Sequence, residues 1–510
     1  MNTLDTPDTL RDFDLLVVGG GINGVGIARD AAGRGLKVLL CEQHDLAQHT
    51  SSASSKLIHG GLRYLEQYEF RLVSESLGER EVLLRAAPHI VHPMRFVMPH
   101  VPELRPAWMI RAGLFLYDYL ARRQTLPSSH GVDLCVAPYN NGLKPGLTKG
   151  FIYSDCWVDD ARLVIANARA AADLGATILT RSTCTAARRE GALWRVTLLS
   201  DGAAPREVTC RALVNVTGPW AKQFINKSMN LTTTFGLKLV KGSHIVVPRL
   251  YDGEHAFILQ NDDRRVVFVY PYEERYTIIG TTDVEHTGEP GECVVSAEEV
   301  EYLYRAANRY FARALTAADV VWRYCGVRPL FDDGAKNVSK ITRDYTLRID
   351  GDSHTAPSLS VFGGKITTYR KLAEHALEKL ANWFPEMKAP WTAQARLPGG
   401  TLTGLSLAEY ARKTQAKYSG ISGQLIHALV CRHGDATPAV LGQAQSLADL
   451  GQHFGYTLYS NEVDYFIAHE WAHTADDVLW RRTKCGLHLN AQQKQSLGHY
   501  FSAHAAVPVR

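Results

Sequence analysis

The sequence predicts an α/β protein with an inserted antiparallel β-sheet and a separate helical domain at its carboxyl end. Two strand–glycine–helix junctions, one near the amino terminus and one near position 363, predict the α/β part. Short β-branched and aromatic runs between 236 and 283 predict the antiparallel sheet. A Pro- and Gly-rich linker that ends at Gly400 precedes residues 401–510, for which we expect helices.

The first junction predicts a site for an adenine dinucleotide. The strand at 15–18 runs into a G-x-G-x-x-G turn, which a helix of small residues and a second strand follow. Gly19 permits a tight turn, Gly21 lets the backbone approach a pyrophosphate, and Gly24 lets the helix pack closely on the strand. The helix amino terminus then offers free N–H groups to the phosphates. Glu42 follows the second strand, at a spacing that suits hydrogen bonds to a ribose hydroxyl.

A polar loop follows this Rossmann-like unit. Small hydroxyl residues suit hydrogen bonding near a cofactor pyrophosphate, and a flexible linker is the simpler alternative. The residues expected to bind the cofactor here are Ser51, Ser52, Ser54 and Ser55. Beyond the loop, the pattern predicts a helix over 71–87 and a second loop at 153–160 that leads into an alanine-rich helix.

The chain returns to the cofactor at two later places. The strand at 211–216 runs into Thr217 and Gly218, as in flavoproteins with two dinucleotide-binding units. The strand at 359–362 runs into Gly363 and Gly364, and a helix with apolar residues at helical spacing follows. The amino terminus of that helix can face the pyrimidine end of a reduced flavin.

Composition excludes several other classes of function. The net charge of +4, with an ordinary 21% of charged residues, is too weakly basic to indicate a nucleic-acid-binding protein. The nine cysteines form no C-x-x-C pair, so we expect neither an iron–sulfur cluster nor structural zinc, and we expect reduced thiols in a cytoplasmic protein. The polar first residues argue against a leader peptide. The sequence contains no run of 18 apolar residues, so we expect no membrane-spanning helix. The H-E-x-x-H segment His469–His473 is expected to be accidental among 20 histidines, with no metal bound.

With these features in place, the sequence resembles the FAD-dependent respiratory glycerol-3-phosphate dehydrogenases of bacteria over essentially all 510 residues. The motifs that carry the resemblance are Gly19–Gly26, Ser51–Glu66, Tyr153–Arg162, Lys241–Val247, Ile279–Val284, Gly326–Leu330, Thr342–Tyr345, Phe362–Leu372 and Ala475–Gly486. The resemblance implies a FAD-binding domain of the D-amino-acid-oxidase type. It also implies hydride transfer from C2 of sn-glycerol 3-phosphate to FAD N5, which yields dihydroxyacetone phosphate, and electron transfer to ubiquinone or menaquinone.

The resemblance further divides the chain into an oxidoreductase domain at 1–398 and a helical cap domain at 399–510. Within the first domain, the expected FAD-binding parts are about 1–90, 150–225 and 335–388, and the α+β substrate region is about 226–334.

A dianionic substrate phosphate needs fixed cations, preferably arginines that bind it through two N–H groups. By resemblance these are Arg63, Arg328 and Arg343, whose alternative is a surface ion pair. His244 is the candidate base because imidazole titrates near neutrality, and its alternative is a strand histidine bonded to backbone.

Other residues of the family motifs complete the expected site. Lys365 is expected to polarise the forming carbonyl or to stabilise negative charge on the flavin, and its alternative is an exposed lysine in a first helical turn. Arg328 is counted with His244 and Lys365 as catalytic. Tyr64 can close the pocket by hydrogen bonding, and Thr367 is expected near the cofactor with Gly363 and Gly364.

Transfer of electrons to quinone requires contact with lipid. The tract 106–123 predicts a helix that is too short and too charged to span a bilayer. Its polar stripe consists of Arg111, Asp118 and Arg122, with aromatic residues elsewhere. The helix can lie at the membrane surface with its basic residues among the headgroups, or it can be a buried core helix. The basic cluster 481–484 is a second possible membrane contact. We expect a homodimer bound peripherally to the cytoplasmic face of the inner membrane.

Two other functions remain open at this point. One is a glycerol-3-phosphate oxidase, in which oxygen replaces quinone and hydrogen peroxide forms. The other is a flavin-binding redox sensor without turnover. A peroxide assay tests the first, and bleaching of the flavin by substrate tests the second.

Overall fold

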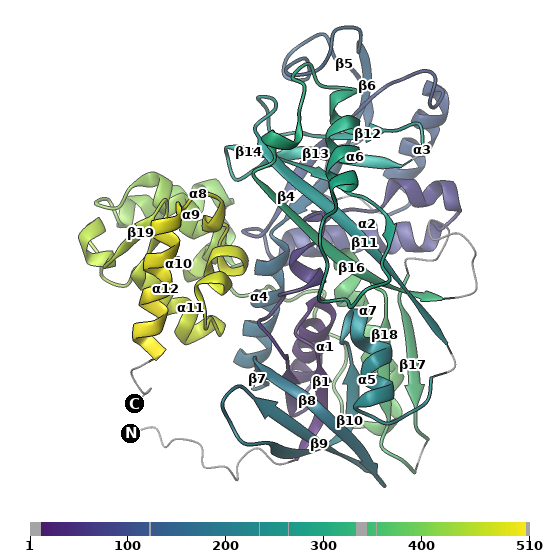
Figure 1. Ribbon diagram of the computed structural model, residues 1–510, viewed down its shortest axis with the longest axis vertical. Helices are drawn as coiled ribbons and strands as arrows, with labels where there is room; N and C mark the ends of the chain where they lie inside the picture. Colours follow the sequence, from purple (N-terminus) through teal and green to yellow (C-terminus); the bar gives the residue numbers. More distant parts are fainter. Residues whose placement is uncertain are drawn as a thin grey trace.

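The computed structural model describes residues 12–121, 124–233, 235–263, 265–332, 344–352 and 354–505. An elongated body with two β-sheets stands beside a smaller globule of helices from the carboxyl end of the chain (Figure 1). The predicted α/β class, the inserted sheet and the helical carboxyl-terminal part are confirmed. The division at 398/399 stays a prediction.

The first sheet is the nucleotide-binding one, and its strands run in the order β17-β18-β10-β1-β2-β7. Strand β1 pairs in parallel with β10 and β2, and β18 pairs in parallel with β10. The strands of this sheet are β1 (Phe13–Val18), β2 (Val38–Cys41), β7 (Thr177–Leu179), β10 (Arg206–Asn215), β17 (Thr346–Asp350) and β18 (Ser358–Phe362), and the hairpin β8 (Ser182–Glu190) and β9 (Leu193–Ser200) extends it from β10.

Both faces of this sheet are covered, which explains the continuous apolar strands. Leu15 and Val17 enter a core with the helices α1 (Ile22–Gly33), α4 (Asp160–Asp173) and α7 (Tyr369–Leu380). Leu16 and Val18 point the other way, because successive strand residues alternate in direction. They pack with the β8–β9 hairpin and α5 (Ala221–Lys227).

The second sheet lies at the other end of the body and is mostly antiparallel (Figure 1). Its order is β15-β11-β14-β13-β12-β4-β6-β3, with β16 paired to β11 and β5 to β6. Its strands are β3 (Leu57–Ile58), β4 (Val91–Pro99), β5 (His130–Asp133), β6 (Lys149–Val158), β11 (Gly236–Pro248), β12 (Ala256–Gln260), β13 (Val266–Tyr272), β14 (Tyr276–Gly280), β15 (Val284–Glu285) and β16 (Trp322–Asp332). One face of the sheet is covered by α6 (Ala297–Asn308), and the other packs against α2 (Phe70–Ala86) and α3 (Ala107–Tyr119).

One predicted loop is a strand. Residues 153–158, expected as part of a loop, belong to β6, which pairs along its length with β4. Serine, aspartate and cysteine in this stretch weaken the strand pattern, and the long-range pairing overrides that local signal. The alanine-rich helix after it is confirmed as α4.

The carboxyl-terminal part is a helical globule with cores of its own. Its helices are α8 (Leu407–Lys417), α9 (Gly423–His433), α10 (Thr437–Leu441), α11 (Ser460–Glu470) and α12 (Ala491–Ala505). It is joined to the body by a buried ion pair between Arg162 of α4 and Glu470 of α11. Across the described ranges, no helix combines the length and the apolar character needed to cross a bilayer.

The aromatic tract forms α3 (Ala107–Tyr119), and it has one buried and one exposed face. Asp118 lies on the buried face, where its carboxylate accepts hydrogen bonds from Ser129. The expected polar stripe is therefore wrong for this residue, and Arg122 lies outside the described residues. The exposed side chains are Trp108, Met109, Phe115, Leu116 and Tyr119.

Two further expectations are wrong. The basic cluster at 481–484 is no surface feature, because Arg482 is fully buried and ion-paired with Asp45. The thiols are not all reduced, since Cys293 and Cys325 form a disulfide.

Candidate active site

The glycine turn at the start of α1 has the geometry of a phosphate-binding turn. Gly21 is the residue that caps α1, and Gly19 has a φ of 120°, which favours glycine. A Cβ atom at Gly24 would lie 1.9 Å from the carbonyl oxygen of Gly19. The turn therefore brings strand and helix together as closely as a pyrophosphate site requires.

Two adjoining cavities run from this turn to the second sheet. The larger one, about 410 Å³, is lined by the glycine turn together with Glu42, Thr217 and Gly218. The smaller one, about 200 Å³, contains most of the predicted substrate residues. The residues common to both walls are Ile22, Thr50, Ser51, Pro329, Gly363 and Gly364. The two cavities together would hold FAD, and the N–H groups of the glycine turn would be available to its pyrophosphate.

Glu42 lies in the wall of the larger cavity, as a ribose-binding acid should. Its carboxylate accepts hydrogen bonds from the backbone N–H of Gly20 at 2.6 Å and of His44 at 2.8 Å. Burial raises the pKa of Glu42. Because a carboxylate has about four acceptor positions, it retains capacity for ribose hydroxyls.

The four predicted serines have different surroundings. Ser51 accepts a hydrogen bond from the N–H of Ile22 at 3.0 Å and lines both cavities, so it adjoins the helix terminus. Ser54 donates to Asp160 at 2.7 Å, and it lines the smaller cavity with Ser55. Ser52 instead lines a different cavity, next to the carboxyl-terminal globule.

His244 is buried on β11 and faces the smaller cavity. Its Nε2 lies 2.9 Å from Oγ of Ser55, and its ring stacks on Tyr324 with centroids 4.7 Å apart. Burial, followed by the charges of Lys56 and Arg328, lowers the pKa of His244 well below its usual value. The imidazole is therefore neutral at neutral pH, as a proton acceptor must be.

Arg328 projects from β16 into the smaller cavity, where Gly242 of the neighbouring strand makes room for it. A Cβ atom at Gly242 would lie 2.3 Å from its Nη2. Asp283 lies between two of the predicted phosphate ligands. Its Oδ1 is 3.0 Å from Nη2 of Arg328, and its Oδ2 is 3.9 Å from Nη1 of Arg63. Arg343 lies outside the described residues.

Lys365 and Tyr64 meet in the wall of the smaller cavity. The Nζ atom of Lys365 lies 3.7 Å from the ring centroid of Tyr64, which is the geometry of a cation–π contact. Lys365 is half-buried and precedes a short 3₁₀ turn, so α7 begins later than the sequence predicts, at Tyr369. Thr367 is buried and accepts a hydrogen bond from the N–H of His59 at 3.2 Å.

The H-E-x-x-H segment does not form one helical face. Helix α11 ends at Glu470, and Trp471 has a φ of 54°. Glu470 is ion-paired with Arg162, so it is engaged in structure. In the described part of the chain, no group of three or more His, Cys, Asp or Glu residues is arranged to hold a metal ion.

The prediction from sequence missed Asp283 and the partner of His244. Asp283 belongs to the family motif Ile279–Val284. Its place in that motif is the signal by which the sequence could have identified it as a site residue. Contact between Ser55 and His244, which are 189 positions apart, has no local signal. Trp220 and His49 also line the larger cavity, where their rings lie 4.7 Å apart.

Comparison with known proteins shows what the chain is similar to. A family model described as FAD dependent oxidoreductase matches residues 14–370, and one described as the C-terminal domain of alpha-glycerophosphate oxidase matches residues 390–501. The aerobic glycerol-3-phosphate dehydrogenase of Escherichia coli (strain K12) is 52% identical, over 96% of this chain and 97% of that protein. The D-erythritol 1-phosphate dehydrogenase of Brucella abortus (strain 2308) is 50% identical over the same shares.

A solved structure shows the same fold with the cofactor. The crystal structure of the glycerol-3-phosphate dehydrogenase from Bacillus halodurans complexed with FAD superposes with a TM-score of 0.73. Its sequence identity is 26%, and the match covers 96% of this chain and 94% of that one. With the paired glycine turns and the elongated cavity, these matches establish that the chain belongs to the family of FAD-dependent glycerol-3-phosphate dehydrogenases.

Proposed function

We propose that this protein oxidises sn-glycerol 3-phosphate to dihydroxyacetone phosphate with FAD as its oxidant. The observation that carries the proposal is the convergence of His244, Arg328, Lys365 and Tyr64 on one cavity, beside the turn at Gly363. The full-length similarity to the E. coli aerobic enzyme supports the same reaction.

FAD, when bound, would supply the acceptor for the hydride of the substrate's C2–H bond. The chain itself holds the phosphate and removes a proton. Arg328, and Arg63 on the far side of Asp283, bind the phosphate dianion through charge-assisted hydrogen bonds. Ser55 orients the ring of His244 through Nε2, and the neutral imidazole takes the C2 hydroxyl proton at this nitrogen when the substrate hydroxyl replaces the Ser55 contact.

Lys365 places a positive charge beside the forming carbonyl oxygen. Its contact with the Tyr64 ring fixes the ammonium group in the half-buried site, where a preoriented charge needs little reorganisation. Tyr64 belongs to the 3₁₀ turn Leu62–Gln67, which also carries Arg63, so one short element supplies both a substrate ligand and the support for Lys365.

An anaerobic titration with glycerol 3-phosphate tests the reaction. We expect the visible absorbance of the oxidised flavin to bleach and a quinone analogue to restore it. No bleaching in a protein that is nonetheless yellow would refute the substrate. Formation of stoichiometric hydrogen peroxide in air would favour the oxidase instead.

A variant pair tests the phosphate site. Arg328→Ala should raise the KM for glycerol 3-phosphate far more than it lowers the FAD content. Arg323→Ala is the matched control, because Arg323 lies on the same strand and is exposed. An unchanged KM in Arg328→Ala would remove Arg328 from the phosphate site.

We further propose that the electrons pass to ubiquinone or menaquinone, and that α3 places the protein on the cytoplasmic face of the inner membrane. Trp108, Phe115 and Tyr119 are 71%, 57% and 67% exposed, and the aromatic pair Tyr68 and Phe70 is also exposed. A cluster of exposed aromatic side chains is typical of an interaction surface, and aromatic rings favour the membrane interface.

Flotation with liposomes tests the membrane contact. The triple variant W108S/F115S/Y119S should lose liposome binding and keep its flavin. The control L193S/L199S removes exposed apolar residues of the β8–β9 hairpin and should bind as before. Equal binding of all three proteins would refute α3 as the contact. The homodimer that the family resemblance implies is tested by light scattering.

The identity to the D-erythritol 1-phosphate dehydrogenase supports a second candidate substrate, a four-carbon polyol phosphate. Such a substrate shares the phosphate and the secondary alcohol, so the same residues would act on it. Comparison of kcat/KM for the two compounds decides between them. A value for D-erythritol 1-phosphate that exceeds the value for glycerol 3-phosphate would reverse our assignment.

A further inference from the structure

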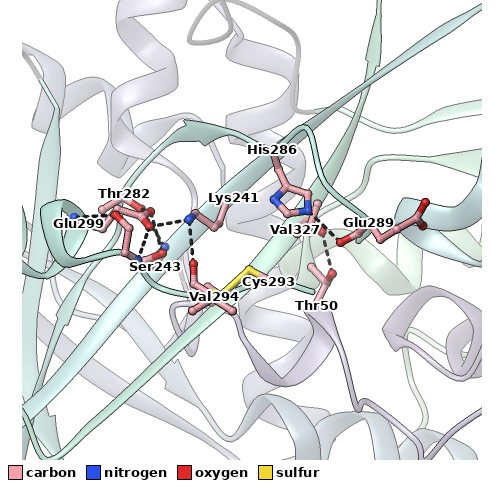
Figure 2. The surroundings of a disulfide bond; sticks show 12 residues. Thr50, Lys241, Ser243, Thr282, His286, Glu289, Cys293, Val294, Glu299 and Val327 are labelled. Atoms are coloured by element: carbon pink, nitrogen blue, oxygen red, sulfur yellow. Dashed lines mark hydrogen bonds and ion pairs between the residues drawn. A yellow bond between two sulfur atoms is a disulfide. The ribbon is translucent and has the colours of Figure 1, made fainter. Parts of the chain in front are cut away.

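The disulfide between Cys293 and Cys325 lies next to the proposed phosphate site. Cys325 is on β16, three positions before Arg328, and it faces Ser243 on β11. Cys293 belongs to the segment 281–295, which connects β14 to α6. The two Cα atoms are 6.1 Å apart. Figure 2 shows the bond between this segment and the strand.

The segment 281–295 also carries Asp283, and three contacts attach it to β16. They are the disulfide, the ion pair of Asp283 with Arg328, and the hydrogen bond from Arg328 to the carbonyl oxygen of Thr282 at 3.1 Å. Strand β15, which lies within the segment, also pairs with β11. Lys241 holds the segment next to Cys293, because its Nζ donates to the carbonyl oxygen of Val294 at 2.9 Å (Figure 2). The geometry of the phosphate site therefore depends on how this segment is fixed.

The strand side of the disulfide is joined to the cofactor loop. Thr50 donates a hydrogen bond to the carbonyl oxygen of Val327, two positions after Cys325, at 2.7 Å (Figure 2). Thr50 lines both parts of the proposed cofactor and substrate space. The disulfide therefore joins the segment 281–295 to β16, and β16 is hydrogen-bonded to a residue that lines both cavities.

A separate cavity gives small molecules access to the two sulfur atoms. Its volume is about 290 Å³, and Cys293 and Cys325 are both in its wall. Lys56, Arg481 and Lys484 line the same cavity. Each of these cations is ion-paired with a carboxylate, so the cavity offers access to the cysteines rather than a free positive charge. Exchange proceeds by attack of a thiolate on a disulfide sulfur, for which such access is required. Most other described cysteines are buried, namely Cys41, Cys156, Cys184, Cys210 and Cys485.

We propose that Cys293 and Cys325 are a reversible dithiol–disulfide pair that controls substrate affinity. Oxidation consumes one low-molecular-weight disulfide, such as oxidised glutathione. The two cysteine thiols lose two protons and two electrons, their S–S bond forms through a mixed disulfide, and two small thiols are released. The redox reaction of the two cysteines does not depend on the proposed function, whereas the effect on substrate affinity rests on it.

The sign of the effect follows from preorganisation. In the oxidised form, the segment that carries Asp283 is held against the strand that carries Arg328, so the phosphate site is already formed when substrate arrives. Reduction removes the covalent attachment at Cys293, so only hydrogen bonds and the ion pair of Asp283 then hold the segment in place, and the substrate must supply part of its ordering. We expect the KM for glycerol 3-phosphate to be about fivefold higher in the reduced enzyme.

The first experiment compares FAD-loaded enzyme equilibrated with oxidised glutathione or with dithiothreitol. Alkylation followed by mass spectrometry should show two additional reactive cysteines after reduction, in the peptides that contain Cys293 and Cys325. This readout requires no turnover, so it tests the pair even if the proposed substrate is wrong. Identical alkylation of these two cysteines under both conditions would refute a reversible pair.

The second experiment tests the link to the phosphate site. The variant C293S/C325S should show the KM of the reduced enzyme whatever the redox buffer, while C135S, which removes an exposed cysteine, should respond like the parent protein. If alkylation changes at Cys293 and Cys325 but the KM does not, the proposed control of affinity is wrong. If neither redox form oxidises glycerol 3-phosphate, the proposed function fails, and the alkylation result still decides the pair.

Discussion

Asp283 lies 3.0 Å from Arg328, and the other oxygen of its carboxylate lies 3.9 Å from Arg63. Its carboxylate lies between two guanidinium groups, where we also expect the substrate phosphate to bind. It lowers the net charge of the site and holds the arginines on either side of one point. A phosphate that enters must therefore compete with Asp283 or share its arginines.

Removal of this charge should strengthen anion binding. Asp283→Asn keeps the shape of the side chain but removes one negative charge within a few ångströms of the phosphate. We expect the Ki of inorganic phosphate, measured as a competitive inhibitor of glycerol 3-phosphate oxidation, to fall about tenfold. Asp262→Asn, in the exposed turn between β12 and β13, is the control. A Ki that stays constant or rises would show that Asp283 positions the arginines without competing for them.

Loss of the proposed base should slow the reaction without loss of cofactor. His244→Asn keeps a polar side chain next to Ser55 but cannot accept a proton, so we expect kcat to fall about 10²–10⁴-fold. The visible spectrum of the bound flavin should remain. Ser55→Ala should have a smaller effect, because it removes only the hydrogen bond that orients the ring. Equal activity of His244→Asn and the parent enzyme would assign the proton to another group.

Buried neutral histidines should make the protein less stable in mild acid. Burial lowers the pKa of His255 to about 4, whereas an unfolded histidine titrates near 6.5. Between these two values the unfolded chain binds a proton that the folded chain does not bind. The free energy of unfolding therefore falls as the pH falls from 6.5 towards 4, by up to about 3 kcal/mol for this residue.

A comparison of Tm between pH 5 and pH 7.5 checks this prediction. His255→Gln removes one titrating group, so its Tm should depend less steeply on pH than the Tm of the parent protein. Carboxylates titrate in both proteins, and the difference between the curves isolates His255. Parallel curves would show that folding does not change the pKa of His255.

Local signals predicted the parts of the fold that are continuous in sequence. The strand, glycine turn and helix from Phe13 to Gly33 could be predicted, because there is no room for a side chain at Gly19 or Gly24 and the glycines are visible in the sequence. The same is true of the strand before Gly363. By contrast, the expectation of a loop at 153–158 is wrong, because the partner strand β4 lies about sixty positions earlier and decides the structure of β6.

The site was predicted as a set of residues but not as a set of contacts. His244, Arg328 and Lys365 do line one cavity, as the family motifs suggested. Their partners Ser55, Asp283 and Tyr64 come from elements far apart in the chain, so only the packing of the sheets brings them together. The Cys293–Cys325 bond has the same origin, since scattered cysteines without a spacing motif give no pairing signal.

The buried ion pair between Arg162 and Glu470 should govern how firmly the carboxyl-terminal globule is attached. Burial opposes ionisation of Glu470, but the charge and hydrogen bonds of Arg162 outweigh it, so the pKa of Glu470 lies below its usual value. The two guanidinium nitrogens Nη1 and Nη2 each bind one carboxylate oxygen. Arg162→Met leaves the acid buried without this partner, which should cost about 3–5 kcal/mol.

The double variant R162M/E470M separates the cost of the unpaired charge from the value of the pair. Because two apolar side chains need no desolvation of charge, it should recover most of the Tm lost in R162M. Thermal unfolding followed by circular dichroism and by flavin fluorescence measures both effects. If R162M unfolds at the parent Tm, the pair contributes nothing to stability. If the double variant is as unstable as R162M, the ion pair itself holds the globule to α4.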